Sequence, residues 1–375
     1  MRALFFSVST GAGHTKAAQA LSEYIKHQDK ESCILKVDTL KYASFFVDKI
    51  VINVYINMLK TTPKIYGKLY DITNGGHRLG ENINGLSNRI NKLFLFKIKK
   101  LLKEFTPDII ICTHPFALQM ARNAKKKLNL CVPLLAVVTD YAVHPLWVKG
   151  CADAYILPHE FILNDAMNKG IDRDKIYTYG IPVEDKFLYK LDKNLVRKKF
   201  GFEDVTTFLI MGGSLGFGDI ENIFIKLIKV QRPLQIVVVT GTNNKLKKQL
   251  DKYIYDIHIK KSISILGYVA EINELMDVSD CIITKPGGLT VAEALIKEIP
   301  ICVISPIPGH EEKNATFLIN SGVAACLDKH DSLEDFLCQV LDNEVRYNNM
   351  KRITKVLAKP NACKDIYGLI KKLTS

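Results

Sequence analysis

Residues 283–296 of this 375-residue chain read Ile-Thr-Lys-Pro-Gly-Gly-Leu-Thr-Val-Ala-Glu-Ala-Leu-Ile, and they decide its fold. The apolar run 281–283 predicts a buried parallel strand, 286–288 a turn, and 289–297 a helix. Backbone N–H groups and the positive end of the helix dipole then point at one spot, where glycine lets a phosphate come close. Glu293, five residues past the second glycine, could accept hydrogen bonds from a ribose diol. The alternative is an ordinary strand–helix turn with a surface carboxylate.

Three more glycine-rich turns follow apolar runs that predict strands. Residues 9–14, Ser-Thr-Gly-Ala-Gly-His, lie between a strand over 4–8 and an amphipathic helix over 15–26. Residues 212–218 hold four glycines in seven positions, and residues 306–314 read Pro-Ile-Pro-Gly-His-Glu-Glu-Lys-Asn. None of the four turns fits the dinucleotide-binding fingerprint or a phosphate-binding loop that ends in Gly-Lys-Ser/Thr. The sequence therefore disfavours a kinase or a nicotinamide enzyme.

The length and the order of the elements indicate two α/β domains. A chain of 375 residues with 47% hydrophobic residues can fill two cores. Predicted strands and helices alternate in two sets, separated by a charged, non-periodic linker over 185–194. We expect Rossmann-like domains over 1–185 and 195–358 that face each other across a cleft lined by the glycine-rich turns. A last helix within 360–375 is expected to pack back on the first domain.

The cysteines and the apolar runs indicate a cytosolic protein. The nine cysteines form no C-x-x-C pair and sit mostly inside apolar strands, as Cys112, Cys281 and Cys302 do. We expect buried free thiols in a reducing compartment, not disulfides or metal ligands. We expect no signal peptide, because the chain runs from its first residues directly into a core strand. The longest uncharged apolar run, 50–59, is too short to span a bilayer.

The net charge of +13 lies mainly in the first half of the chain. Residues 1–180 hold 25 Lys and Arg against 15 Asp and Glu, an excess of +10, and residues 181–375 have an excess of +3. The first domain is therefore expected to meet an acidic surface. The chain shows no nucleic-acid recognition module and no basic stripe with interleaved stacking aromatics. We therefore expect no nucleic-acid partner and favour an anionic membrane surface.

Two segments of the first half could lie on such a membrane. Residues 42–60 are apolar almost all round, and residues 90–105 interleave Leu, Phe and Ile with lysines. A basic amphipathic helix can lie in the headgroup layer, which predicts a peripheral protein at the cytoplasmic face of the membrane. The alternative for each segment is a core helix with a rim of lysines whose stems cover apolar surface. The lysines concerned are Lys92, Lys97, Lys99, Lys100 and Lys103.

Six motifs follow one another in a characteristic order between residue 3 and about residue 330. They are 9–14, 139–147 (Thr-Asp-Tyr-Ala-Val-His-Pro-Leu-Trp), 180–183 (Gly-Ile-Pro-Val), 212–214, 285–293 and 308–314. Their order and spacing resemble the diacylglycerol glycosyltransferases, which include the monogalactosyldiacylglycerol synthases and the processive diacylglycerol glucosyltransferases. The resemblance implies the GT-B fold of glycosyltransferase family 28, a UDP-hexose donor, inversion at the anomeric carbon, and no metal or other cofactor. Two departures are His310, where family members usually carry Gln, and Ala12, where they carry a third glycine. The first leaves the donor sugar open.

The donor side of the site is expected mainly on the second domain. Sugar transfer needs stabilisation of the departing UDP, which backbone N–H groups at 212–214 and 287–289 could supply. Glu311 and Asn314 could bond the hydroxyls of the donor sugar, with helix capping as the alternative. The expected UDP-sugar-binding residues are Gly13, Gly212, Gly213, Ser214, Lys285, Gly287, Gly288, Leu289, Thr290, Glu293, His310, Glu311 and Asn314.

The acceptor side needs a base, because an alcohol is a poor nucleophile until its proton can leave. His14, at the mouth of the first glycine-rich turn, is the candidate base, since histidine titrates near neutral pH. The alternative is a histidine at a helix start, bonded to a backbone carbonyl. Asp140, at the end of a strand, could orient or replace His14, or simply cap a helix. His144 and Trp147 could lie beside the acceptor lipid, although Trp147 would fit a core equally well.

These features predict an inverting, metal-independent glycosyltransferase that moves a hexose from UDP to diacylglycerol, once or repeatedly, with glucose favoured over galactose. One alternative is an enzyme of the same fold that uses UDP-N-acetylglucosamine, either a lipid-linked N-acetylglucosaminyltransferase or a UDP-sugar 2-epimerase. The basic, apolar first half counts against the epimerase. Another alternative is a non-catalytic UDP-sugar sensor, against which the presence of His14 beside an intact donor site counts.

Overall fold

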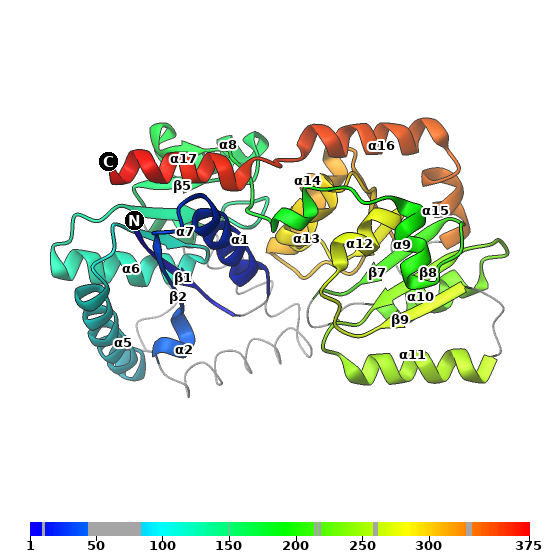
Figure 1. Ribbon diagram of the computed structural model, residues 1–375, viewed down its shortest axis with the longest axis horizontal. Helices are drawn as coiled ribbons and strands as arrows, with labels where there is room; N and C mark the ends of the chain where they lie inside the picture. Colours follow the sequence, from blue (N-terminus) through cyan, green and yellow to red (C-terminus); the bar gives the residue numbers. More distant parts are fainter. Residues whose placement is uncertain are drawn as a thin grey trace. The chain divides into compact units, whose positions relative to one another are not determined.

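The computed structural model describes residues 1–9, 12–43, 84–149, 151–213, 216, 219–257, 262–327 and 332–375 (Figure 1); of residues 43, 84–94 and 257 only the backbone is described. The chain forms two compact units, each with its own six-stranded parallel sheet. Unit 1 comprises Met1–Glu184, Ile307–His310 and Lys359–Ser375. Unit 2 comprises Asp185–Pro306 and Glu311–Ala358. The predicted α/β class with two parallel sheets is therefore confirmed.

The sheet of unit 1 is made of short apolar strands that are buried on both faces. Ile109, Ile110 and Ile111 are fully buried, as expected of parallel strands covered by helices on both sides. Every strand pair in the sheet is parallel. In spatial order the strands are β2 (Cys33–Asp38), β1 (Arg2–Ser7), β3 (Ile109–Cys112), β4 (Leu134–Val137), β5 (Ala154–Ile156) and β6 (Ile176–Tyr177).

The helices of unit 1 bury the faces that the sequence pattern predicts. Ala17, Ala18, Leu21 and Ile25 of α1 are all buried. This helix begins at Ala12, earlier than predicted, so that the second half of the first glycine-rich turn forms its first turn. The helices are α1 (Ala12–Gln28), α2 (Thr39–Ala43), α5 (Asn84–Phe105), α6 (Pro115–Leu128), α7 (Pro145–Lys149), α8 (Leu163–Asn168) and α17 (Ala362–Thr374), with 3-10 turns η2 (Glu160–Ile162) and η3 (Arg173–Lys175).

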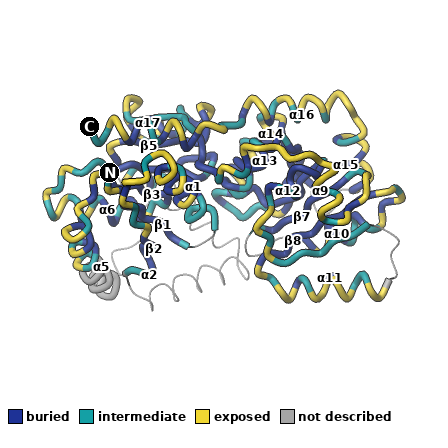
Figure 2. Tube along the Cα trace, viewed as in Figure 1, coloured by how far each residue is buried: buried dark blue, intermediate teal, exposed yellow. Residues whose placement is uncertain are grey.

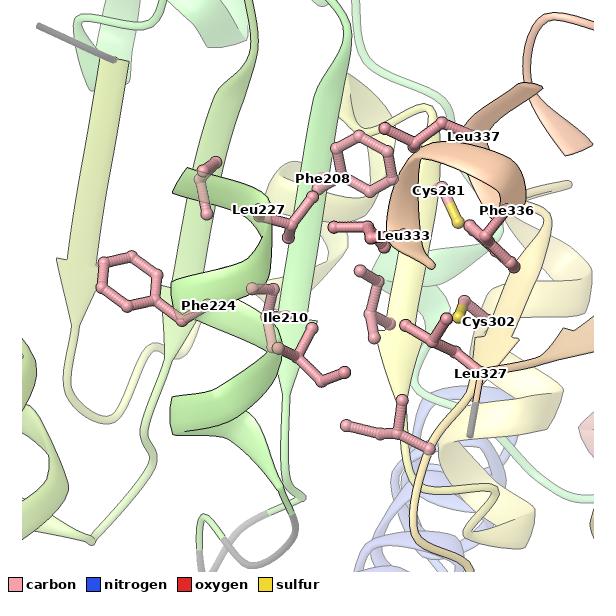
Figure 3. Close-up of a cluster of buried hydrophobic side chains, with 14 of the residues drawn as sticks. Phe208, Ile210, Phe224, Leu227, Cys281, Cys302, Leu327, Leu333, Phe336 and Leu337 are labelled. Atoms are coloured by element: carbon pink, nitrogen blue, oxygen red, sulfur yellow. The ribbon is translucent and has the colours of Figure 1, made fainter. Parts of the chain in front are cut away.

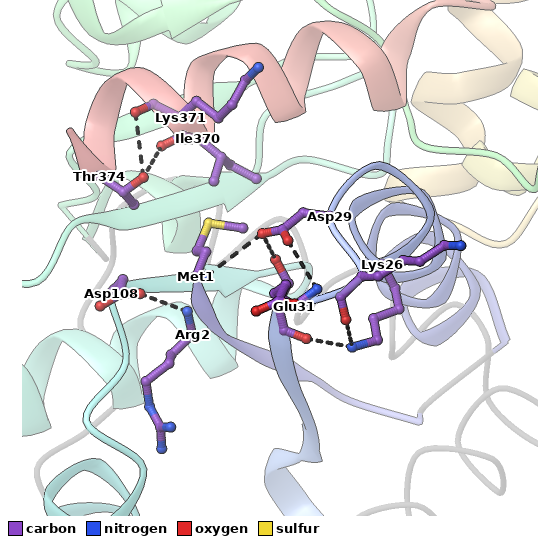
Figure 4. Close-up of polar contacts among 11 residues, drawn as sticks. Met1, Arg2, Lys26, Asp29, Glu31, Asp108, Ile370, Lys371 and Thr374 are labelled. Carbon is purple, nitrogen blue, oxygen red and sulfur yellow. Dashed lines mark hydrogen bonds and ion pairs between the residues drawn. The ribbon is translucent and has the colours of Figure 1, made fainter.

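Polar contacts fix the amino-terminal edge of this sheet (Figure 4). The backbone N–H of Arg2 donates to Asp108 Oδ2 at 2.6 Å, which joins the starts of β1 and β3. The α-amino group of Met1 lies 3.7 Å from Asp29 Oδ2, and Asp29 also accepts a hydrogen bond from the hydroxyl of Ser32. These contacts connect β1 to the segments that lead into β2 and β3 and so fix the relative register of the three strands. The candidate site residues of unit 1 follow the opposite, carboxyl ends of such strands.

The last helix, α17, packs on α1 and on the sheet of unit 1, as predicted (red in Figure 1). Tyr367 lies edge-on to Tyr24, with ring centroids 6.1 Å apart. The chain that leads into this helix passes directly over Gly180, whose φ is +101° and where a Cβ would collide with the Cβ of Lys359. Structure therefore explains why the Gly-Ile-Pro-Val motif begins with glycine: no other residue allows both the positive φ and the close approach of Lys359.

We expect Gly180→Ala to lower the free energy of unfolding by at least about 1 kcal/mol more than Gly170→Ala does, because it adds overpacking to backbone strain. Gly170 is a matched control in the same unit: its φ is +97°, but a Cβ there would find its nearest neighbour, Val148 Cγ1, at 3.9 Å. Denaturant unfolding of the whole chain followed by circular dichroism measures both changes. Equal destabilisation by the two substitutions would contradict the docking role of Gly180.

Unit 2 repeats the arrangement with a second parallel sheet. The inner strands β7 and β8 appear dark blue in Figure 2, while yellow, exposed positions recur along outer helices such as α11. In spatial order the strands are β12 (Ala324–Cys326), β11 (Ile301–Val303), β10 (Cys281–Thr284), β7 (Thr207–Met211), β8 (Gln235–Val239) and β9 (Ser262–Leu266). The helices are α9 (Lys193–Phe200), α10 (Ile220–Lys229), α11 (Asn244–Ile257), α12 (Ile272–Val278), α13 (Gly288–Ile296), α14 (His310–Asn320), α15 (Leu333–Val340) and α16 (Glu344–Leu357).

One face of this sheet packs against α10 and α15 to form the core of unit 2 (Figure 3). Phe208 of β7 and Phe224 of α10 are fully buried. Cys281 and Cys302, on neighbouring strands, lie in the same cluster. This packing fixes β7 and β10, whose carboxyl ends lead into two of the predicted phosphate-binding turns.

The segment expected to link the domains is held on unit 2. Lys297 and Asp277 form a buried ion pair at 2.7 Å, with side-chain exposures of 0% and 3%. Lys297 Nζ also donates to the carbonyl of Tyr189 at 2.6 Å, and the N–H of Leu191 donates to Asp277 Oδ2. The charged stretch 185–194 therefore belongs to unit 2, where it contains the 3-10 turn η4 (Asp185–Phe187) and leads into α9 at Lys193.

The cysteines are free thiols, as predicted, but they are less buried than predicted. Cys112, Cys281, Cys302 and Cys363 are buried, and burial raises the pKa of the Cys281 thiol to about 12. The other five are exposed, so the expectation of burial is wrong for them; these are Cys33, Cys131, Cys151, Cys326 and Cys338. Two of the exposed cysteines, Cys33 and Cys326, lie in the edge strands β2 and β12.

The two segments expected to contact a membrane are only partly described. Of residues 42–60, all beyond Ala43 lie outside the described residues. Helix α5 has a buried face with Ile98 and Leu102, which agrees with the core-helix alternative, but it also carries Phe96 with 68% of its surface exposed. Among the described helices, none is both long enough and apolar enough to cross a membrane.

Candidate active site

In each sheet the chain enters at a central strand and builds outward on both sides. Unit 1 runs from β1 to β2 and then returns to β3 on the other side of β1. Unit 2 runs from β7 to β8 and β9 and then returns to β10. At such a reversal the following helices leave on opposite faces of the sheet, and the crevice at the carboxyl ends of the strands is where α/β proteins bind ligands. The candidate residues gather at these two places.

In unit 2 the turn 286–288 leaves an open space at the start of α13. Gly287 is the N-cap, makes no side-chain capping bond, and a Cβ at this position would meet no protein atom within 4 Å. Its own N–H donates to the carbonyl of Lys285 at 2.9 Å and is therefore used inside the turn. The N–H groups of Gly288, Leu289 and Thr290 lie in the first helical turn, where the helix offers no acceptor. An anion beside Gly287 would meet these dipoles.

Lys285 and Glu311 form a buried ion pair next to this turn. Lys285 Nζ lies 3.2 Å from Glu311 Oε2, and the two side chains are 9% and 10% exposed. Burial lowers the pKa of Lys285, and the charge of Glu311 opposes that shift. Asn314 is fully buried and donates Nδ2 to the carbonyl of Pro286 at 2.9 Å. Glu311 and Asn314, both in the first turns of α14, therefore stabilise the turn 286–288. This role is neither the sugar binding nor the helix capping that the sequence suggested for them.

Two of the expected donor-side residues, Gly13 in α1 and His310 at the start of α14, belong to unit 1. The others described lie on the same edge of the unit 2 sheet. Glu293 is buried in α13, with 5% of its surface exposed. The hydroxyl of Thr284 donates to the carbonyl of Met211 at 2.8 Å, which joins the end of β10 to the end of β7. Gly212 and Gly213 follow β7, and Gly213 has a φ of +70° with open space where a Cβ would lie. Ser214 lies outside the described residues.

In unit 1, His14 is held by the residues that follow β3 and β4. Its Nδ1 lies 2.8 Å from the carbonyl oxygen of Thr113 and 2.8 Å from the hydroxyl oxygen of Thr139. The hydroxyl of Thr113 donates in return to the carbonyl of His14 at 2.9 Å. A carbonyl oxygen can only accept, so Nδ1 carries the proton, and Nε2 is left with the lone pair. His14 therefore does bond a backbone carbonyl at the start of a helix, as the alternative interpretation expected. This bond uses only Nδ1, so Nε2 can still act as a base.

The surroundings of His14 favour its neutral form. Burial lowers the pKa of His14, and the nearby His310 adds to this, while the charge of Asp140 and the carbonyl of Thr113 oppose it. His114 lies edge-on to His14, with ring centroids 4.7 Å apart. Burial, His14 and His144 hold the pKa of His114 well below its usual range. At neutral pH, His14 is therefore uncharged and able to accept a proton.

The predicted acceptor residues follow β4: His144 lies in the loop after it and Trp147 in the short helix α7. His144 Nδ1 accepts a hydrogen bond from the N–H of Leu146 at 3.2 Å. Trp147 is 2% exposed, and its burial supports the core role over contact with a lipid. The loop is anchored by α8: the N–H of Val143 donates to Asp165 Oδ2 at 3.0 Å, and Lys169 Nζ donates to the carbonyl of Val143 at 2.5 Å. This two-point contact holds the backbone between Asp140 and His144.

The partners of His14, Thr113 and Thr139, are not among the residues predicted from the sequence. Thr113 and Thr139 each follow a predicted strand directly, and those strands neighbour each other in the sheet. That position was a usable signal, since the carboxyl ends of neighbouring parallel strands lie side by side. The Asp165–Lys169 contact could not have been found in this way, because both residues lie on a surface helix whose docking depends on the tertiary structure.

Sequence profiles of two families match the two halves of the chain. The profile of monogalactosyldiacylglycerol (MGDG) synthase matches residues 14–183, and that of the glycosyltransferase family 28 C-terminal domain matches residues 207–366. The chain is 30% identical over 271 residues to the processive diacylglycerol beta-glucosyltransferase of Bacillus licheniformis, covering 72% of this chain and 70% of the relative. It is 26% identical over 373 residues to the protein of that name from Bacillus subtilis, covering 97% and 93%.

Solved structures share the fold at low identity. MurG of Acinetobacter baumannii superposes with a TM-score of 0.65 at 17% identity, covering 99% of both chains. The Anabaena protein HepE, crystallised with UDP-glucose, gives 0.60 at 14% identity, covering 99% of this chain and 100% of the other. These likenesses show the GT-B fold. Together with the profiles and the relatives, they establish that the chain belongs to the diacylglycerol glycosyltransferases of glycosyltransferase family 28, which include monogalactosyldiacylglycerol synthase and the processive diacylglycerol β-glucosyltransferases.

Proposed function

We propose that this protein transfers a hexose, with glucose favoured, from UDP to the free hydroxyl of diacylglycerol with inversion at the anomeric carbon. The observation that carries the proposal is the state of His14: Nδ1 is occupied by the carbonyl of Thr113, and the ring is kept neutral. This leaves Nε2 as a base. Family membership supplies the acceptor class, and the names of the relatives favour glucose.

In the proposed reaction the hydroxyl oxygen of diacylglycerol attacks the anomeric carbon as the bond from that carbon to the diphosphate oxygen breaks. His14 Nε2 takes the hydroxyl proton, and UDP leaves with the bonding electron pair. The negative charge of Asp140 stabilises the imidazolium that forms, in agreement with its effect on the pKa of His14. Attack opposite the leaving group converts an α-linked donor into a β-glycoside.

The leaving group is stabilised in this proposal by the turn 286–288 and by Lys285. The N–H groups of the first turn of α13 and the Lys285 ammonium would neutralise the diphosphate, in the place of a metal ion. Glu293 would bond the ribose diol and Glu311 the donor sugar, while Asn314, fully buried against the carbonyl of Pro286, would hold the turn in place. Activity after dialysis against EDTA should equal that of the untreated protein, and loss restored by a divalent cation would refute metal independence.

Thin-layer analysis of lipids tests the proposed reaction directly. The purified protein is incubated with diacylglycerol vesicles and labelled UDP-glucose, UDP-galactose or UDP-N-acetylglucosamine. We expect labelled glucosyldiacylglycerol, and proton NMR should show the β-anomer. Repeated addition would appear as a ladder of di- and triglycosyl lipids. Conversion of UDP-N-acetylglucosamine to its 2-epimer without lipid product would instead favour the epimerase, and binding of UDP-sugar without turnover would favour a sensor.

We also propose that unit 1 attaches the protein to an anionic membrane surface at the cytoplasmic face. The excess of +10 over residues 1–180 supports this. On α5, Phe96 is 68% exposed and the neighbouring Lys100 and Lys103 are also exposed, so an apolar anchor lies beside cationic groups.

Replacing four lysines of α5 with serine should reduce vesicle binding, because each lysine near a charged surface contributes about 1 kcal/mol. The four are Lys97, Lys99, Lys100 and Lys103. Co-sedimentation of the unchanged protein should rise with the fraction of anionic lipid and fall with salt. UDP binding should not change, because α5 carries none of the expected UDP-sugar-binding residues.

The matched control is the same fourfold change on α11 of unit 2, at Lys245, Lys247, Lys248 and Lys252. It removes equal charge from a helix to which the proposal gives no lipid contact. If both variants lose binding equally, net charge and not α5 attracts the membrane, and the assignment of this helix is wrong.

A further inference from the structure

His14 contacts two threonines, and these contacts determine which of its two ring nitrogens can accept a proton. Thr113 and Thr139 are 0% and 4% exposed, so neither side chain exchanges its partner for water. Both oxygens lie 2.8 Å from the same nitrogen, Nδ1. The two contacts come from the ends of adjacent strands, β3 and β4. The imidazole ring is therefore held at Nδ1 by residues that follow two adjacent strands of the sheet.

The two oxygens act differently on the ring. The carbonyl of Thr113 belongs to the backbone and cannot be removed by substitution, and it requires a proton on Nδ1. The hydroxyl of Thr139 then shares that N–H as a second acceptor. Two acceptors on Nδ1–H direct partial negative charge at the ring and stabilise the imidazolium that forms when Nε2 takes a proton. A carboxylate performs this task for the histidine of a serine-protease triad.

We propose that Thr139 is a positioning residue for catalysis: as a second acceptor on Nδ1–H it reinforces the tautomer that the carbonyl of Thr113 requires, and it holds the ring so that Nε2 faces the acceptor hydroxyl. The inference rests on the proposed function of His14 as base and adds to it the side chain that fixes the base. Thr139 precedes Asp140, so the end of β4 provides both the hydroxyl that orients the ring and the charge that stabilises it.

The first test reads the tautomer in the unchanged protein. Nitrogen-15 NMR of ring-labelled histidines, with the His14 signals assigned by their absence in His14→Ala, should show Nδ1 protonated and Nε2 unprotonated above neutral pH. The opposite tautomer would overturn the proposal without any variant of Thr139. This measurement needs no activity, so it stands even if the proposed transfer reaction fails.

The second test replaces Thr139 with valine, which keeps the shape and removes the hydroxyl. Turnover should fall about 3- to 10-fold, the change expected from one hydrogen bond of ordinary strength. The KM for the UDP-sugar should stay within about twofold, and the His14 nitrogen signals should shift. Thr139→Ser, which restores the hydroxyl, should return turnover to within about twofold of the unchanged protein.

The control is Thr354→Val in α16 of unit 2. Thr354 is also fully buried, and its hydroxyl donates to the carbonyl of Lys351 at 2.7 Å. It tests whether loss of any buried threonine hydroxyl has the same effect, and it should change neither turnover nor the His14 signals. An active protein in which Thr139→Val keeps full turnover and unchanged His14 signals would overturn the role of Thr139 and leave His14 as base. A protein that makes no glycolipid at all would refute the proposed function instead.

Discussion

His14→Ala is expected to lower the turnover of glycolipid synthesis by about 10²–10⁴-fold, the usual contribution of a general base. The reason is structural: His14 is kept neutral, and Thr113 occupies its Nδ1, so that Nε2 is the nitrogen able to take the proton. UDP affinity, measured by calorimetry, should stay nearly unchanged, because the expected UDP contacts of this region are made by the backbone.

His27→Ala is the matched control for this substitution. His27 lies at the exposed end of the same helix, so the variant loses the same side chain from α1 without touching the candidate site. If His14→Ala keeps activity within a few-fold, His14 is structural and Asp140 becomes the candidate base. If UDP affinity collapses instead, His14 belongs to the phosphate site.

The pH dependence of the unchanged protein gives an independent reading of the same residue. The pKa of His14 is lowered from its ordinary value of 6.5, so the neutral, active form persists as the pH falls to that value. The kcat/KM should therefore be flat through neutral pH and fall only as the pH drops through the lowered pKa. Asp140→Asn removes a charge that raises the pKa of His14, and should move this acid limb to still lower pH. A fall in kcat/KM that begins above pH 6.5 would contradict the lowered pKa of His14.

The strands that could be predicted are those whose residues are apolar throughout. The run Ile109–Cys112 is buried on both faces, and its sequence shows this without any tertiary information. Strand β2 (Cys33–Asp38) was missed because it is an edge strand with Lys36 exposed in its middle, so its sequence lacks a continuous apolar run. Strand β12, at the edge of the other sheet, lies in an apolar run but is only three residues long, and two of them are alanine, which is depleted in strands.

The candidate site could be predicted as a set of turns but not as a set of bonds. Glycine-rich sequences after strands predicted the turns at the carboxyl ends of both sheets, because the residues that favour a turn lie within the turn itself. The partners inside the site are not local. Lys285 and Glu311 are 26 positions apart, and His14 and Thr139 are 125 apart. Which of these side chains meet depends on strand order, and the glycine-rich turns alone do not fix that order.

Glu293→Ala is expected to weaken UDP binding by about tenfold to a hundredfold, since a charge-assisted hydrogen bond is worth roughly 1.5–3 kcal/mol. Glu293 is 5% exposed in the second turn of α13, the helix whose N-cap is Gly287. A nucleotide whose diphosphate lies at the turn 286–288 would bring its ribose within reach of α13. Isothermal calorimetry with UDP measures the change.

A control variant and a modified ligand separate this role from general damage. Glu274→Ala removes a carboxylate from α12 of the same unit, where it pairs with Lys199 at 2.6 Å, and should leave UDP affinity unchanged. If Glu293 bonds the ribose diol, the unchanged protein should bind 2′,3′-dideoxy-UDP as weakly as Glu293→Ala binds UDP. The variant should no longer distinguish the two ligands, because the group that reads the diol is gone. Additive losses, in which the variant still prefers UDP over the dideoxy ligand by the full factor, would show that another residue reads the ribose and that Glu293 supports α13 alone.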